Sequence, residues 1–294
     1  MNLQGIVDTL VQGLLLGGHF ALSGLGLALA FGILRIVNIA HGDLLVVAAY
    51  LGVAVVALTP LPALAAVFVV VPVMAALGWL LQRALFQRVV GHGELAPMLV
   101  TFGLSIIVHN VLQELFSADF KTLDAGAAKT ASVELAGLHL GWLPLATLAA
   151  AVVVYALVHA AMRGTRFGRI VRATVDDPEI AAAFGVDTRR VYAAGMALAL
   201  AIAGIAGWLY GIKSSFNPMT GGDQLLFAFE TVIIGGMGSI WGSFVGGMVL
   251  GVAQVIGLHV HAGWGAFAGH LAFFAFLFLR PQGLLARGAG GDHG

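Results

Sequence analysis

The chain contains no cysteine among its 294 residues, which excludes disulfide bonds and thiolate metal sites. Charge is also scarce, because only 10% of the residues are Asp, Glu, Lys or Arg and the formal net charge is zero. Soluble domains carry about 25% charged residues. A neutral chain without a basic soluble domain has no electrostatic basis for binding nucleic acid. These absences exclude a disulfide-stabilised domain and a nucleic-acid-binding protein.

Several catalytic motifs are missing as well. No GxxxxGK[ST] phosphate loop occurs, so the chain has no such loop to cradle ATP. No HExxH zinc motif is present, and Ser239 does not form a GxSG-plus-His arrangement, which argues against an intramembrane enzyme. His259 and His261 next to Gly263 indicate a polar turn rather than a metal site. We therefore expect no catalytic residue, no cofactor and no metal.

What the chain has in excess is apolar sequence. Hydrophobic residues make up 60% of it, and the mean hydropathy is +0.99. The uncharged runs are Thr9–Leu34, Leu44–Gln82, Leu95–Gln113, Leu135–Met162, Val191–Ile212 and Thr231–Leu279. Each is long enough to cross about 30 Å of hydrocarbon at about 1.5 Å per helical residue, and two are long enough to cross twice. The sequence predicts an all-α polytopic helical membrane protein whose residues 1–294 form a single transmembrane domain.

The predicted protein has eight or nine transmembrane segments, two of them interrupted by glycine and an acid. They lie at about Leu10–Ile33, Leu44–Leu58, Ala63–Leu81, Leu95–Phe116, Trp142–Met162, Val191–Ile212, Asp223–Gly238, Ile240–Gly257 and Trp264–Leu279. The first is too long for a signal peptide and lacks its cleavage site, so we expect a mature helix. Its many glycines favour close helix packing. Asp223–Gly238 is short, and crosses only if the bundle buries it.

One stretch, 162–192, concentrates ten of the 28 charged residues between two apolar runs. The positive-inside rule places its loop, 163–190, on the cytoplasmic side together with Arg83, Arg88, Arg280 and Arg287. The loop 117–141 holds three acids against two bases and therefore faces outward. A polar surface of this size on a membrane protein indicates a docking site for a soluble partner, although a basic loop held by lipid headgroups is the alternative.

Two polar interruptions occur within apolar spans, one early and one late. Broken segments in corresponding places of two halves indicate a transport pathway, and ionisable groups at membrane depth face a cavity or a partner. The candidate pathway or gating residues are Asn38, His41, Asp43, Glu230, Gly235, Gly236 and Gly238. The alternatives are a tight interfacial loop at 38–43 and, for Glu230, a helix–helix hydrogen bond or an interfacial position. His19 and His109 are expected to be packing residues.

Blocks of residues along nearly the whole chain resemble LivH-type permeases, the membrane subunits of branched-chain amino acid ABC importers. They are Gly17–Leu22, Gly24–Leu27, Asn38–Asp43, Arg172–Ala173, Asp177, Gly185–Val186, Arg189–Arg190 and Ile233–Ser239, with Gly242, Gly246, Gly247 and Gly251. The NxAHG and GGxGS blocks together are specific, whereas either alone is weak. The resemblance implies a second, LivM-like permease subunit, two ATP-binding subunits and an external solute-binding protein as partners, surrounded by membrane lipid.

The resemblance also implies a cytoplasmic coupling helix of the pattern Glu-Ala-Ala-x-x-x-Gly, which docks into a groove on the ATPase. Glu179, Ala181 and Gly185 match that spacing, whereas Ile180 departs from it. Asp177 is a suitable N-cap and Pro178 a suitable first helical residue. Ala181 to Ala183 would offer a flat face of small side chains. The candidate coupling residues are Arg172, Asp177, Glu179, Ala181, Gly185, Arg189 and Arg190.

The expected function is that of a permease subunit in a bacterial inner membrane, which forms the translocation path for a small neutral amino acid, above all leucine, isoleucine or valine. The same family blocks occur in permeases for urea, short amides or other small solutes, which is one alternative. An ion-coupled secondary transporter is another, with Asp43 and Glu230 as the candidate ion sites. Transport that needs an ion gradient rather than ATP would favour the latter.

Overall fold

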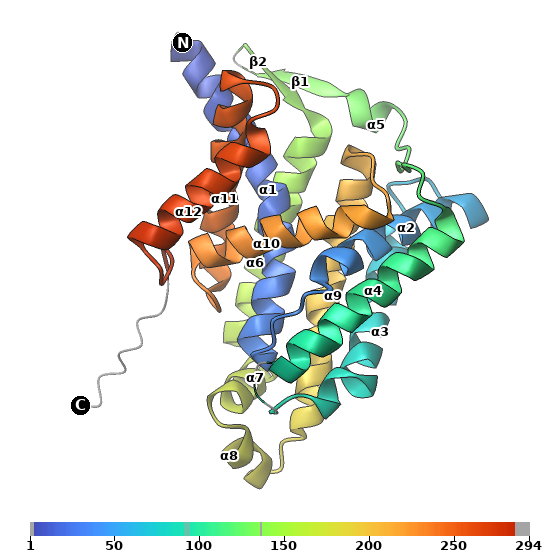
Figure 1. Cartoon of the computed structure of the whole chain (residues 1–294), viewed down its shortest axis with the longest axis vertical. Coiled ribbons are helices and arrows are strands. Elements are labelled where there is room, and N and C mark those ends of the chain that lie inside the picture. Colours follow the sequence, from blue (N-terminus) through green and yellow to red (C-terminus); the bar gives the residue numbers. More distant parts are fainter. Residues whose placement is uncertain (1–2, 92, 94, 136, 286–294) are drawn as a thin grey trace.

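A computed structural model describes residues 3–91, 93, 95–135 and 137–285, and Figure 1 shows their arrangement. The α-helices are α1 (Leu3–Leu34), α2 (His41–Leu58), α3 (Val67–Ala84), α4 (Leu95–Phe116), α5 (Ala127–Thr130), α6 (Trp142–Gly164), α7 (Arg166–Asp176), α8 (Pro178–Ala183), α9 (Thr188–Lys213), α10 (Gly221–Gly235), α11 (Ile240–Val260) and α12 (Gly265–Leu279). Two 3₁₀ turns, η1 (Phe86–Arg88) and η2 (Pro218–Thr220), and two strands, β1 (Ser132–Leu135) and β2 (Leu138–Gly141), complete the described elements.

Seven helices of the described chain are long and apolar enough to cross a membrane: α1, α2, α3 with η1, α4, α6, α9 and α11. α12 is a shorter apolar helix, and α10 has only 15 residues. The longest, α1, has 32 residues and so extends about 48 Å at 1.5 Å per residue. The prediction of a polytopic helical membrane protein is confirmed, with α10 as the short element that the sequence placed at Asp223–Gly238.

The connection 117–141 is more structured than the sequence suggested. β1 and β2 pair antiparallel, with Ser132 opposite Gly141 at the open end of the hairpin. A bridge between Lys121 and Phe216 ties the same connection to the segment after α9. The hairpin has no long alternating pattern that would have identified it, because each strand has only four residues.

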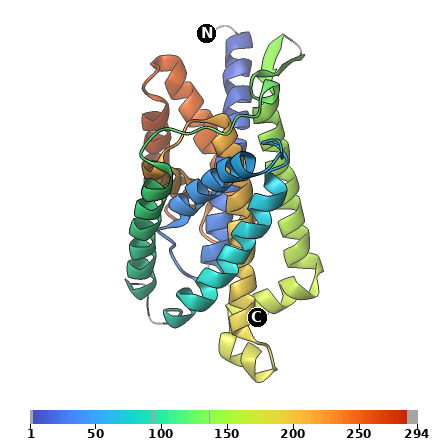
Figure 2. The same cartoon turned by 90° about the vertical axis from the view of Figure 1, so that its right-hand side faces the viewer.

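The two ends of the molecule differ in kind. Figures 1 and 2 show the N-terminus and the β1–β2 hairpin at one end, and α7 and α8 projecting from the other. Gln12 Nε2 donates to the His139 carbonyl at 3.2 Å, which ties α1 to the hairpin. If α7 and α8 lie in the cytoplasm, as the positive-inside rule predicts for the Arg-rich loop, the N-terminus lies on the outer side. Arg287 lies outside the described residues.

Small residues allow the central helices to touch. A Cβ atom on Gly17 of α1 would lie 2.8 Å from the Gly247 carbonyl oxygen of α11. The two backbones could therefore not lie this close together if Gly17 were replaced by a larger residue. A Cβ atom on Gly251 would likewise overlap the backbone of Gly13 and Gly17. In lipid, where packing rather than hydrophobicity drives helix association, such contacts are the main stabilising interaction. The glycine-rich first helix therefore packs as its sequence predicts.

The first predicted interruption, at 38–43, follows α1, whereas the second, at 230–238, is the end of α10 and its turn into α11, so the two do not occupy corresponding places. The long helix α1 is followed by the link 35–40 and then α2, whereas α9 is followed by the link 214–220 and then α10. The first turns of α2 and α10 meet, because a Cβ atom on Gly42 would overlap the Gly221 carbonyl oxygen and Leu225. We call the links 35–40 and 214–220 the breaks of the two halves. The halves thus touch through α2 and α10, the helices that follow these breaks.

Candidate functional site

The charged stretch folds as a helical elbow, defined here as α7 and α8 with residues 165–187. Thr165 caps α7 by accepting a hydrogen bond from the Gly168 amide at 3.1 Å. Asp177 caps α8, because its carboxylate accepts from the amides of Glu179 and Ile180, both at 2.9 Å. This geometry is the one expected of an Asp-Pro helix start. The predicted short helix therefore exists at the predicted residues.

The face that α8 exposes differs from the one predicted. Ala181 is only 5% exposed, so it packs α8 onto the elbow instead of facing a partner, whereas Ala182 and Ala183 are exposed. The large apolar side chains on the open side are Ile180, 57% exposed, and Phe184, 86% exposed. These two are four residues apart and hence share a helix face. We call Ile180 and Phe184 the apolar tip.

A residue in the left-handed backbone conformation follows α8, directly after the apolar tip. Gly185 has φ 84° with nothing near its missing Cβ, and the Val186 amide donates to the Ala181 carbonyl at 3.1 Å. A glycine is favoured here because residues with a Cβ resist positive φ. Glu179 and Gly185 are both exposed, as a role in docking requires.

The predicted arginines serve different purposes. Arg172 donates to the Met162 carbonyl at the end of α6, and so fastens α7 to a membrane helix. Arg190 pairs with Asp187 at 2.8 Å, and Arg189 is exposed. An arginine that the sequence analysis did not select, Arg35, donates to the Val175 carbonyl of α7 at 3.3 Å. The elbow is thus bonded both to α6 and to the residue where α1 ends.

Arg35 also begins the first interruption. It adopts φ 54°, which is uncommon for a residue with a side chain, and turns the chain out of α1. Asn38, fully buried, accepts a hydrogen bond from the Ala40 amide at 3.1 Å, while the His41 amide donates to the Asn38 carbonyl at 3.2 Å. The His41 ring lies 3.0 Å from the Ser23 carbonyl of α1. Asn38 and His41 therefore shape the turn between α1 and α2.

Asp43 forms the first of two buried acid–histidine pairs. Its carboxylate is 2.8 Å from Nε2 of His109 on α4, and the residue is 3% exposed. The His109 side chain is 24% exposed, so it reaches from the protein surface to the buried acid. A carboxylate at this depth requires a partner, because an unpaired charge in an apolar medium is costly. The predicted packing role of His109 includes this pairing.

Glu230 forms the second pair, with His270 of α12. Its Oε1 contacts Nδ1 of His270, the Glu230 side chain is 1% exposed, and the ring of His270 stacks on Phe227 at 5.6 Å between centroids. Each half of the chain therefore anchors the helix after its break through a buried acid to a histidine on a later helix. His270 was not predicted, and its only sequence signal is a polar residue within an apolar run.

The end of α10 forms a tight turn into α11. Gly236 and Gly238 have φ 101° and 81°, and Gly235 is packed directly against the backbone of Gly242. The segment after α12 covers this turn, because the amides of Leu284 and Leu285 donate to the Ile234 and Gly235 carbonyls at 2.9 and 3.0 Å. These glycines are thus used for conformation and close approach.

The predicted residues form three separate groups rather than one site: the elbow, the 38–43 turn and the α10 segment. The first two are joined through Arg35, and the last two through the contact between α2 and α10. A further link between the halves is His19 of α1, whose Nε2 lies 3.2 Å from the Gln224 side chain of α10. Sequence reasoning did not select Arg35, Phe184 or His270. Arg35 connects the elbow to the 38–43 turn, Phe184 exposes an aromatic ring on the elbow, and His270 holds Glu230.

Comparison with known proteins identifies relatives over the full length. The chain is 28% identical over 299 residues to the high-affinity branched-chain amino acid transport system permease protein BraD of Pseudomonas aeruginosa, covering 96% of each. It is 25% identical over 303 residues to the corresponding LivH protein of Escherichia coli, again covering 96% of each. A probable LivH of Methanocaldococcus jannaschii matches at 25% identity over 79% of this chain and 75% of its own length.

No solved structure matches the chain. Residues 9–279 match the family described as branched-chain amino acid transport system / permease component. That match includes the elbow, both interruptions, α1 from Thr9 onward and the other six long helices. The chain therefore belongs to the family of permease components of branched-chain amino acid transport systems.

Proposed function

We propose that this chain is a permease subunit of an ATP-binding-cassette importer in a bacterial inner membrane, and that it forms part of the path for a branched-chain amino acid. The names of its full-length relatives support this solute class. Hydrolysis is assigned to two separate ATP-binding subunits, because the chain has no phosphate-binding loop. A second, LivM-like permease subunit and an external solute-binding protein complete the proposed assembly.

The observation that carries the proposal is the elbow, with its exposed apolar tip and its bonds to the membrane helices. Ile180 and Phe184 are exposed at α8, which projects from one end of the molecule. There they suit a groove on a soluble ATPase. Arg35 bonds the elbow to the start of the first interruption. A movement of the docked ATPase would therefore be passed through α7 to the turn at Asn38, and from there to α2 and α10.

The pathway is assigned to the side of the molecule where α2 and α10 meet. Asp43 and Glu230 are nearly fully buried and are each held by a histidine, so they position these helices rather than contact solute. Gly235, Gly236 and Gly238 give α10 the sharp end at which it can tilt.

The solute within the family is the finer part of the proposal. Urea, short amides and other small solutes remain the competing class, and uptake assays with labelled leucine, urea and acetamide separate them. Leucine uptake that is inhibited by isoleucine and valine but not by urea supports the proposed solute.

The docking role is tested by substitutions on the exposed side of α8. Glu179→Lys reverses a charge there, and Gly185→Trp adds an indole at a position that favours glycine. We expect each to reduce ATP-driven leucine uptake about tenfold or more, the effect of losing an interface hot spot. Membrane insertion should be unchanged.

A matched control for the glycine substitution is Gly91→Trp. Gly91 has φ 85° and open space around it, like Gly185, but belongs to the connection before α4 and not to the elbow. The control should retain uptake. Normal uptake in both Glu179→Lys and Gly185→Trp would contradict docking at α8.

A further inference from the structure

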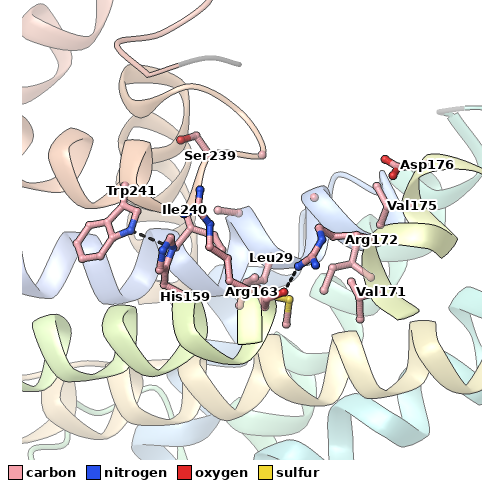
Figure 3. A pocket seen from close by; sticks show the side chains of 15 residues that line it. Leu29, His159, Arg163, Val171, Arg172, Val175, Asp176, Ser239, Ile240 and Trp241 are labelled. Carbon is pink, nitrogen blue, oxygen red and sulfur yellow. Dashed lines mark hydrogen bonds between the residues drawn. The ribbon is translucent and has the colours of Figure 1, made fainter. Parts of the chain in front are cut away.

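A cavity of about 390 Å³ lies between the elbow and the membrane helices, and Figure 3 shows its side chains. Its walls come from α1, the end of α6, α7 and the turn between α10 and α11. The volume is within the range of about 300–1,000 Å³ that small-molecule sites occupy. The cavity thus lies where the proposed coupling element faces the proposed gate.

The inner part of the cavity is aliphatic. Leu29 and Ile33 of α1 line it, with Val171 and Val175 of α7 opposite. Leu29, Ile33 and Val171 are each at most 5% exposed, so this surface is shielded from water. An occupant with a branched aliphatic side chain would gain free energy by moving its own apolar surface out of water.

The cavity also carries charges of both signs. Arg163 and Arg172 line it, and the first turn of α11, capped by Ser239, opens onto it. The unsatisfied amides of a helix N-terminus attract anions, so this region favours a carboxylate. Asp176, one turn after Arg172 on α7, supplies the negative charge. Figure 3 draws Asp176 on the far side of Arg172 from Arg163, so a small molecule with a carboxylate and an apolar side chain matches the part of the cavity next to Arg163.

A hydrogen bond between two helices lies at one edge of the cavity. Trp241 Nε1 of α11 donates to Nδ1 of His159 on α6 at 3.1 Å, and Figure 3 shows the two rings bonded at one edge of the cavity. A phospholipid that entered at this edge would have to pass an acyl chain between these helices. The hydrogen bond therefore favours a soluble occupant that enters from the cytoplasm over a lipid headgroup.

We infer that this cavity is a cytoplasm-facing binding site for a neutral aliphatic amino acid, in which Arg163 holds the carboxylate and α1 the side chain. The inference rests on the proposed function, because it takes the solute class from there. An occupant joins α7 to the α10–α11 turn and so hinders the movement that the elbow transmits. Amino acid that accumulates in the cytoplasm therefore slows further uptake.

The central variant is Gly32→Leu, which fills the cavity. Gly32 lines it, and a Cβ atom there would meet nothing closer than the Gly238 Cα at 3.8 Å, so the side chain can enter without displacing backbone. Gly103→Leu is the matched control, because Gly103 is also helical and has nothing within 4 Å of its missing Cβ. The purified chain in nanodiscs should bind L-leucine, as should Gly103→Leu, whereas Gly32→Leu should not.

The role of Arg163 is tested with an analogue that lacks the carboxylate charge. Arg163→Gln should weaken leucine binding about tenfold, as expected for a lost hydrogen bond to a charged group, without affecting leucinamide. Nanodiscs of phosphatidylcholine, phosphatidylethanolamine or phosphatidylglycerol give the lipid arm. Leucine binding that is absent in all three, together with lipid retention that Gly32→Leu abolishes, would overturn the inference in favour of a headgroup site.

Uptake by the complete transporter in proteoliposomes separates this inference from the proposed function. Lumenal leucine at about ten times its Kd occupies about nine-tenths of the sites, so wild-type uptake should fall several-fold. For the transporter that carries Gly32→Leu, the ratio of uptake with lumenal leucine to uptake without it should be close to one. Wild-type leucine uptake that is insensitive to lumenal leucine would refute the inference alone, whereas no ATP-driven leucine uptake at all would refute the proposed function.

Discussion

ATP-driven leucine uptake by the Phe184→Asp variant should fall to the background level. Phe184 is 86% exposed at the apolar tip, next to Ile180 on the same face of α8. If this ring occupies a groove on the ATPase, aspartate removes its apolar contact and places an unpaired carboxylate in a desolvated pocket. Central aromatic residues of interfaces cost about 2–4 kcal/mol or more when removed, which corresponds to a loss of affinity of about thirtyfold to a thousandfold.

Two controls isolate the docking effect. Phe184→Leu keeps an apolar side chain and should retain most of the uptake. Phe120→Asp introduces the same change at a 70% exposed phenylalanine in the 117–141 connection, which lies away from α7 and α8 (Figure 1). Co-purification of the ATPase should be lost only with Phe184→Asp. Full uptake and normal ATPase retention by that variant would show that α8 does not carry the interface.

The second large effect concerns the pair of Glu230 and His270, measured as a double-mutant cycle of unfolding in detergent micelles. His270→Ala leaves a 1% exposed carboxylate without its partner, and breaking a buried pair in this way costs about 3–5 kcal/mol. Glu230→Ala should cost less, because the side chain of His270 is 30% exposed and can hydrogen-bond to water once its partner is removed. The double variant should be less destabilised than the sum of the two, by about 1.5 kcal/mol or more.

The same cycle with Asp43 and His109 is the matched comparison. There too the acid side chain is buried and the histidine is partly exposed, at 4% and 24%. We expect the same asymmetry, with His109→Ala more destabilising than Asp43→Ala. Additive effects within both pairs would mean that neither acid is anchored by its histidine, and would reopen a direct role for Asp43 and Glu230 in binding a solute or an ion.

The sequence predicted the helices well because their signal is local. An uncharged run long enough for a bilayer leaves few alternatives to a helix, and the Asp177-Pro178 pair predicted the start of α8 for reasons of capping alone. The four-residue strands of the β1–β2 hairpin have no such local pattern. Predicted helix ends differ by several residues for α1, because its first turns hold polar residues such as Asp8 that lowered the apolar signal.

The candidate site was predicted less completely because it depends on tertiary contacts. Three adjacent alanines suggested a flat docking face, but the turn of α8 onto α7 buries Ala181 and exposes Phe184. The partner of Glu230 lies 40 residues away in the chain, and no short spacing identifies it. The contact of Arg35 with the Val175 carbonyl depends on the position of α7, which the sequence around Arg35 does not indicate.

The most direct test of the account is reconstitution of this chain in proteoliposomes, alone and with its permease, ATPase and solute-binding partners, followed by measurement of leucine accumulation with lumenal ATP. We predict accumulation only in the complete assembly, and its loss when Phe184→Asp replaces the native chain. Accumulation of leucine against its gradient by the chain alone would contradict the central claim, that a separate ATPase drives this permease through α8.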